Sequence, residues 1–163
     1  MINVDKNTFL DINLKAINKN YNIIKQIVGR KCIIAATVKA DAYGLGADKV
    51  VNSLIKKGCK YFFVATTNEA IFLRKLNKRI FIFILNGLVT KELKNIRKFN
   101  LIPVINNLAQ LKKIENYQKK NNCFLNIAIH FDTGMSRLGL DQNETENLIK
   151  NKALLIKRSK LRL

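Results

Sequence analysis

Short apolar runs alternate along this chain with segments in which apolar residues recur every three or four positions, and this alternation constrains the fold more than any other feature. Continuous apolar runs are typical of strands buried on both faces of a parallel sheet with helices outside it. The order therefore predicts an α/β protein built from β/α units. The predicted buried strands are residues 32–38, 61–65, 80–85, 102–105 and 124–130.

Local signals define several element ends. Residues 9–13 alternate weakly, which predicts a strand before the first helix, and that helix is expected to stop at Gly29. Thr66 stands three residues before Glu69, the spacing of a capping box at a helix start. Asp141 is expected to begin the last helix by capping its first turn. Periodicity leaves two architectures open, a doubly wound sheet and an incomplete (β/α)8 barrel.

Length and apolar content predict one modest domain of 163 residues. The apolar runs are much shorter than the roughly 20 residues that a membrane-spanning helix needs, so no span is expected. The N-terminus lacks a basic start leading into an apolar stretch, which argues against a secretory signal and favours the cytoplasm.

The formal net charge of +19 raises the possibility of nucleic-acid binding. Lysines are scattered through all the predicted helices, however, which fits a general Lys/Asn/Ile bias better than a selected basic surface. Cys32, Cys59 and Cys123 form no C-x-x-C pair and are interpreted as reduced residues. With His130 as the single histidine, no metal site is expected.

Two motifs follow predicted strands: T-V-K-A-D-A-Y-G-L-G at residues 37–46 and H-F-D-T-G-M-S-R-L-G at residues 130–139. Parallel α/β folds bind ligands at the carboxyl ends of their strands, so both motifs lie where a site is expected. Lys39 ends an apolar strand, where desolvation would favour a neutral, nucleophilic amine that can form a Schiff base with an aldehyde such as pyridoxal phosphate. A lysine that extends into solvent fits the same position.

The segment V-K-A-D-A-Y-G-L-G-A at residues 38–47 resembles the cofactor-lysine signature of the alanine racemase family, and residues 132–139 are similar to the family's D-T-G-M-x-R-L-G segment. Shorter matches fall between them in the expected order, at residues 11–17, 63–70 and 85–87, so that the resemblance covers about residues 9–140. It implies a (β/α)8 barrel followed by a β-domain, a homodimer, and pyridoxal phosphate at the barrel mouth. The implied reaction interconverts L-alanine and D-alanine for peptidoglycan precursors.

The resemblance also assigns roles to residues. Lys39 would form the Schiff base with pyridoxal phosphate and act as the base on the D-alanine side, and Tyr43 would hold the cofactor phosphate. Arg137 would lie beside the cofactor's phenolic oxygen and bind the substrate carboxylate. His130 stands where many members have a lysine that can be carbamylated, and a neutral imidazole could support Arg137 only as an acceptor. Tyr43 as a packing residue, Arg137 as a solvated residue and His130 as an ordinary strand end remain alternatives.

Members of that family are much longer than this chain. The resemblance therefore predicts an N-terminal half of the barrel at residues 1–146, without the β-domain that carries the second base, and an off-pattern basic tail at residues 147–163. Racemisation exchanges protons on both faces of a carbanion, so the chain alone is predicted to be inactive unless a C-terminal half complements it. The alternatives are a non-catalytic module that binds pyridoxal phosphate and a basic protein that binds nucleic acid.

Overall fold

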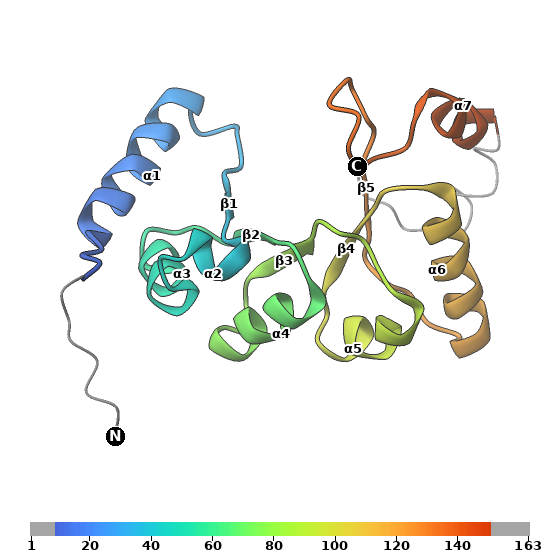
Figure 1. Cartoon of the computed structure of the whole chain (residues 1–163), viewed down its shortest axis with the longest axis horizontal. Helices are drawn as coiled ribbons and strands as arrows, with labels where there is room; N and C mark the ends of the chain where they lie inside the picture. Colours follow the sequence, from blue (N-terminus) through green and yellow to red (C-terminus); the bar gives the residue numbers. More distant parts are fainter. Residues whose placement is uncertain (1–8, 151–163) are drawn as a thin grey trace.

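A parallel sheet of five strands forms the centre of the computed structural model, which describes residues 9–150. The strands pair in chain order, from β1 to β5, and helices separate them (Figure 1). A doubly wound sheet would reverse its strand order, so chain order agrees with the predicted incomplete (β/α)8 barrel. The elements are α1 (Leu14–Val28), β1 (Ala35–Thr37), α2 (Lys39–Tyr43), α3 (Ala47–Lys56), β2 (Tyr61–Val64), α4 (Thr67–Leu76), β3 (Phe81–Ile84), the 3-10 helix η1 (Thr90–Glu92), α5 (Leu93–Lys98), β4 (Ile102–Ile105), α6 (Leu108–Asn121), β5 (Ala128–Ile129) and α7 (Gln142–Lys150).

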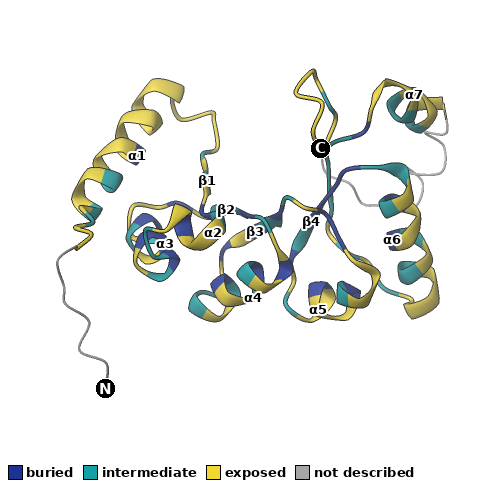
Figure 2. Ribbon diagram, viewed as in Figure 1, coloured by how far each residue is buried: buried dark blue, intermediate teal, exposed yellow. Residues whose placement is uncertain are grey.

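The main core lies between the sheet and the helices that follow its strands. In β2 and β3, alternate residues are buried, because successive side chains of a strand point to opposite faces. The helices contribute apolar positions spaced three or four residues apart. Figure 2 shows the buried residues gathered along this contact. The core includes Val50, Val51, Leu54, Phe62, Val64, Ala70, Leu73, Ile82, Ile84 and Ile96.

The other face of β2 and β3 carries a pair of aromatic stacks. The ring centroids of Tyr61 and Phe81 lie 4.8 Å apart, as do those of Phe63 and Phe83. Phe81 remains 45 % exposed. The apolar runs predicted strands that are buried on both faces, and this prediction was wrong for β2 and β3. Among the described residues, no second layer fully covers the aromatic face.

The two edge strands are also shorter and more exposed than predicted. The predicted strand 32–38 is reduced to β1, and Ile33 before it is 68 % exposed. The predicted strand 124–130 is reduced to β5, and Phe124 is 79 % exposed. An edge strand has a neighbouring strand on one side only, so fewer side chains surround it. Its apolar residues can therefore stay exposed.

Residues 9–13 form no strand, and this prediction was wrong. Asn13 is instead the N-cap of α1, because its side-chain oxygen accepts a hydrogen bond from the amide of Ala16 at 3.0 Å. Phe9 and Leu10 are exposed. Helix α1 ends at Gly29 as predicted, but Tyr21 is the one buried residue of its apolar face, and Figure 2 shows most of the helix exposed.

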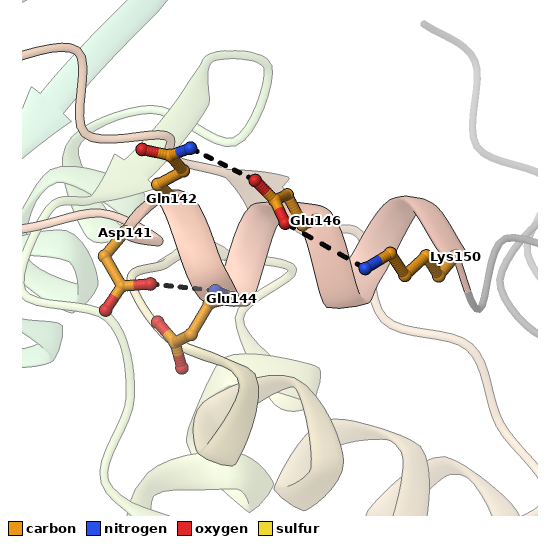
Figure 3. Close-up of polar contacts among 5 residues, drawn as sticks. All are labelled: Asp141, Gln142, Glu144, Glu146 and Lys150. Atoms are coloured by element: carbon orange, nitrogen blue, oxygen red, sulfur yellow. Dashed lines mark hydrogen bonds and ion pairs between the residues drawn. The ribbon is translucent and has the colours of Figure 1, made fainter.

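The helix starts predicted from capping residues are confirmed. Thr66 and Glu69 form a capping box at α4. Asp141 accepts a hydrogen bond from the amide of Glu144 at 2.8 Å, which caps α7 (Figure 3). The Glu144 carboxylate in turn accepts from the amide of Leu108, the first residue of α6, at 2.8 Å and ties the two helices together.

Residues 147–150 continue α7 to its end. The rest of the predicted basic tail, 151–163, lies outside the described residues, so the division at residue 146 stays a prediction. Within 9–150, no helix is both long and apolar enough to cross a membrane. Cys32, Cys59 and Cys123 are all free thiols, and burial is the main cause that raises the pKa of Cys59.

Candidate active site

Residues from three strand ends meet in one cleft of about 480 Å³ at the carboxyl edge of the sheet. Lys39 follows β1, Leu85 and Asn86 follow β3, and His130 follows β5. Arg137 reaches the same cleft from the loop after β5. Small-molecule sites in proteins commonly have volumes of about 300–1,000 Å³. The two sequence motifs, far apart along the chain, therefore line one site of suitable size for a small ligand.

Lys39 is the first residue of α2, which is a short left-handed turn and not an ordinary right-handed helix. The next four residues, Ala40 to Tyr43, all have positive φ, between 51° and 58°. Each L-residue in this conformation costs about 1–2 kcal/mol relative to the right-handed form, so four in succession must be held by other contacts. The Lys39 side chain itself is half-buried, because β1 is an edge strand, and the predicted desolvation of its amine is only partial.

Two carboxylates hold the backbone of this turn. Glu69 on α4 accepts a hydrogen bond from the amide of Ala40 at 2.8 Å, and Asp41 accepts one from the amide of Ala47 at 2.7 Å. Asp41 thereby ties the turn to the first residue of α3. Hydrogen bonds to charged acceptors are stronger than those between neutral groups, and they offset part of the conformational cost.

The loop that carries Arg137 is closed at its base. The amide of Leu140 donates to the carbonyl of His130 at 2.8 Å, and the amide of Asp132 donates to the carbonyl of Leu140 at 2.9 Å. At Gly139, φ is +110°, and a Cβ would lie 2.7 Å from the backbone nitrogen of Asp132. The second glycine of the motif is thus required by close backbone approach.

Asp132 organises the inside of this loop. One of its oxygens accepts hydrogen bonds from the amides of Gly134 and Ser136, both at 3.0 Å. These bonds, with Gly134 the larger contributor, hold the pKa of the half-buried Asp132 carboxyl below its usual range. The carboxylate is therefore used within the loop.

His130 is fixed by Asn106, which follows β4. The Asn106 side-chain nitrogen donates to the carbonyls of Leu85 and Val104 at 2.8 and 3.2 Å. Its oxygen lies 2.9 Å from Nδ1 of His130. Asn106 is buried, so this amide links the ends of β3, β4 and β5.

The remaining sequence candidates differ in placement. Tyr43 is 62 % exposed and does not line the cleft, although its ring centroid is 5.9 Å from the Lys39 amine. Arg137 is exposed on the cleft and has neither an ion pair nor a hydrogen bond with any of residues 9–150. The structure thus brings Lys39, His130 and Arg137 to one cleft and leaves Tyr43 beside it.

Sequence reasoning missed the contacts of Asn106 and Glu69. Asn106 directly follows a predicted strand, so its position at a strand end was a usable signal. Glu69 was recognised only as half of a capping box, and no sequence pattern shows that its carboxylate also reaches the backbone after β1.

A parallel β/α sheet in chain order, with a cleft at its carboxyl edge, defines an α/β protein of the barrel class, in which small ligands commonly bind at this edge. The model of the family described as "Alanine racemase, N-terminal domain" matches residues 12–161. The chain belongs to the alanine racemase family.

Relatives with known sequence or structure agree with this assignment. The chain is 43 % identical to the alanine racemase of Rickettsia prowazekii over 147 residues, which are 90 % of this chain and 36 % of the relative. The alanine racemase of Bartonella henselae, solved with covalently bound pyridoxal phosphate, is 35 % identical with a TM-score of 0.84, over 92 % of this chain and 42 % of that one. The biosynthetic enzyme of Pseudomonas aeruginosa is 31 % identical with a TM-score of 0.77, over 91 % and 40 %. The chain thus spans about two fifths of the length of the relatives it matches.

Proposed function

We propose that this chain supplies the cofactor-binding part of an alanine racemase, which interconverts L-alanine and D-alanine in the cytoplasm for peptidoglycan precursors. One observation carries the proposal: the Lys39 amine and the Arg137 guanidinium line the same cleft, and neither has an anionic partner among residues 9–150. The Asp132 carboxylate also lines the cleft, but it accepts hydrogen bonds from the amides of Gly134 and Ser136. Two cations against this one carboxylate leave an excess of positive charge in a concave site, which favours an anionic ligand. Pyridoxal phosphate and the carboxylate of an amino acid both have this charge.

The residues present fit pyridoxal phosphate by their chemistry. Lys39 offers the primary amine that an aldehyde requires, Arg137 offers a planar donor for anionic oxygens, and Tyr43 would offer a hydroxyl to the phosphate if its side chain turns toward it. When bound, the cofactor would act as an electron sink that makes the α-proton of an amino acid labile. Lys39 would then remove or return that proton on one face of the substrate, while Arg137 orients its carboxylate.

Proton exchange on the second face needs another base on the opposite side of the substrate. In this proposal that base and the rest of the phosphate site come from residues beyond the described ones or from a partner chain. A complementing C-terminal polypeptide, contributed across the homodimer that the family resemblance implies, would meet this need.

Trapping of the cofactor tests the proposal. The purified 163-residue chain is incubated with pyridoxal phosphate, reduced with borohydride and mapped by peptide mass spectrometry. We expect an adduct concentrated at Lys39 that disappears in Lys39→Ala. Labelling spread evenly over the lysines would contradict the assignment of the site.

Formation of D-alanine is measured in the same preparation. We expect none from the chain alone, and robust turnover would contradict the proposal that a second base is needed. Trapping at Lys39 that never leads to D-alanine, even with a complementing racemase half, would favour the non-catalytic module instead.

A further inference from the structure

Glu69 makes a set of contacts that its capping role does not require. One carboxylate oxygen accepts from the amide of Thr66 at 3.1 Å, which is the ordinary bond of a capping box. The same oxygen accepts from the neighbouring amide of Ala65 at 2.7 Å. The other oxygen accepts from the amide of Ala40 at 2.8 Å. A single side chain thus joins the end of β2 to the residue directly after Lys39.

The amide of Ala40 is the first of the left-handed turn. On the other side of Lys39, the carbonyl of Val38 accepts from the amide of Ala42 at 3.0 Å, and the amide of Val38 donates to the carbonyl of Phe63 at 2.8 Å as a continuation of the β1–β2 pairing. Lys39 therefore sits between two held peptide groups: the Val38–Lys39 group is bonded to the Ala42 amide, and the Lys39–Ala40 group is bonded to Glu69. The direction of its Cα–Cβ bond depends on both.

We propose that Glu69 is a positioning residue for Lys39. By holding the Ala40 amide, its carboxylate keeps the left-handed turn in place and so directs the Lys39 amine to the cleft. This inference rests on the proposed function of Lys39 as the residue that binds pyridoxal phosphate. Glu69 does not line the cleft and acts through the backbone, not on the ligand.

A carboxylate is needed at residue 69 because N–H donors face both of its oxygens. The amides of Ala65 and Thr66 face one oxygen, and the amide of Ala40 faces the other. A carboxylate accepts on both oxygens, whereas a glutamine has one accepting oxygen and one donating nitrogen. In Glu69→Gln, the side chain can still cap α4, but its nitrogen would then face the Ala40 amide as a second donor. The substitution keeps the size of the side chain and breaks one of the two connections.

Two control variants separate this effect from a general weakening of α4. Thr66→Ala removes the hydroxyl that accepts from the Glu69 amide at 3.4 Å, and it leaves the Glu69 carboxylate intact. Glu92→Gln changes a carboxylate that accepts from the Thr67 hydroxyl at 2.8 Å, at the start of the same helix but away from the turn.

The experiment measures how strongly pyridoxal phosphate prefers Lys39 over the other lysines of the 163-residue chain, by borohydride trapping and peptide mapping. The other lysines are the internal reference. We expect Glu69→Gln to lower this preference about tenfold or more, the effect of one lost hydrogen bond to a charged group. The preference should change less than about twofold in Thr66→Ala and Glu92→Gln, because their losses leave the Ala40 bond in place. An unchanged preference in a folded Glu69→Gln variant would overturn the proposal.

Hydrogen exchange provides a readout that needs no cofactor. The amide of Ala40 should be protected in the unmodified chain and should exchange faster in Glu69→Gln, while the core amides of β2 and β3 keep their protection. If the variant does not fold, the unmodified chain still tests the proposal. Exchange of the Ala40 amide at the rate of an unstructured peptide would overturn the role of Glu69. Absence of any Lys39 preference in the unmodified chain, with Ala40 protected, would instead refute the proposed function of Lys39 and with it the positioning role.

Discussion

The side-chain oxygen of Asn106 lies 2.9 Å from Nδ1 of His130, and this pair determines which ring nitrogen carries the proton. The Asn106 nitrogen already donates to two carbonyls, so its oxygen is the acceptor toward His130. Neutral His130 must then be protonated on Nδ1, which leaves Nε2 as the acceptor. A histidine in this tautomer can support the guanidinium of Arg137 from the same cleft, as a hydrogen-bond acceptor and not as an anion.

Replacement of Asn106 should weaken both the fold and the His130 tautomer. In Asn106→Leu, the carbonyls of Leu85 and Val104 lose their donor in a buried position, which should lower the free energy of unfolding by about 1–3 kcal/mol. Urea unfolding measures the loss, and Asn116→Leu, at an exposed position of α6, is the control. Nitrogen chemical shifts of the His130 ring should report a protonated Nδ1 in the unmodified chain and a mixture of tautomers in the variant. A protonated Nε2 in the unmodified chain would contradict the assignment.

Arg74 on α4 should be one of the most sensitive charged residues for stability. Its guanidinium donates to five backbone carbonyls, and burial lowers the pKa of the group from its usual value. Arg74→Met should lower the free energy of unfolding by about 2–3 kcal/mol, because these carbonyls lose a charged donor. The matched control is Arg97→Met at an exposed position of α5, which should change it by less than about 0.5 kcal/mol. Equal effects of the two changes in urea unfolding would refute this account. The five acceptors are the carbonyls of Asn77, Lys78, Ile80, Phe99 and Asn100.

The loop around Asp132 should lose order in acid. The pKa of the Asp132 carboxyl is lowered in the folded state. The stabilisation that this carboxylate gives is therefore complete above the unfolded-state pKa of about 4 and is lost as the pH falls through the folded-state pKa. Hydrogen exchange of the Gly134 and Ser136 amides, corrected for the intrinsic pH dependence, should accelerate in that lower range. In Asp132→Asn, the corrected rates should show no such acid transition. A transition of the same size in the variant would show that another group controls the loop.

Two glycines of this loop separate steric clash from backbone conformation. Both Gly134 and Gly139 have positive φ, but a Cβ at Gly134 would meet nothing within 4 Å, whereas one at Gly139 would meet the backbone of Asp132 at 2.7 Å. Gly139→Ala should therefore lower the free energy of unfolding by at least about 1 kcal/mol more than Gly134→Ala. Thermal or urea unfolding of the two variants tests this difference. The Leu140 amide, which closes the loop, should lose its exchange protection only in Gly139→Ala.

The order of the β/α units was predictable from the chain, because periodicity and capping residues are local signals. The capping box at Thr66 and the cap at Asp141 were correctly predicted for this reason. Burial at the sheet edges was not predictable, since residues 32–38 and 124–130 have the composition of central strands but lack neighbours on one side. The composition of a strand shows which of its side chains can be buried. Whether they are buried depends on the elements that pack around the strand.

The candidate site divides in the same way. Both motifs were expected to lie together because they follow predicted strands of a parallel sheet, and the choice of Lys39 and Arg137 within them came from the family resemblance. The hydrogen bond from Ala40 to Glu69 depends on how α4 is placed relative to β1, which no local pattern contains. Contacts through a shared backbone are thus the part of a site that only the folded arrangement reveals.

Chain order in the sheet has a consequence for synthesis on the ribosome. Within residues 9–150, each strand pairs with the strands immediately before and after it in the chain, so every β/α unit of this part can dock on the preceding one as soon as it has left the exit tunnel. None of the five described strands has to wait for a distant segment before it finds a neighbour. The nascent polypeptide can therefore fold vectorially, with a single growing edge that advances from β2 to β5 as translation proceeds.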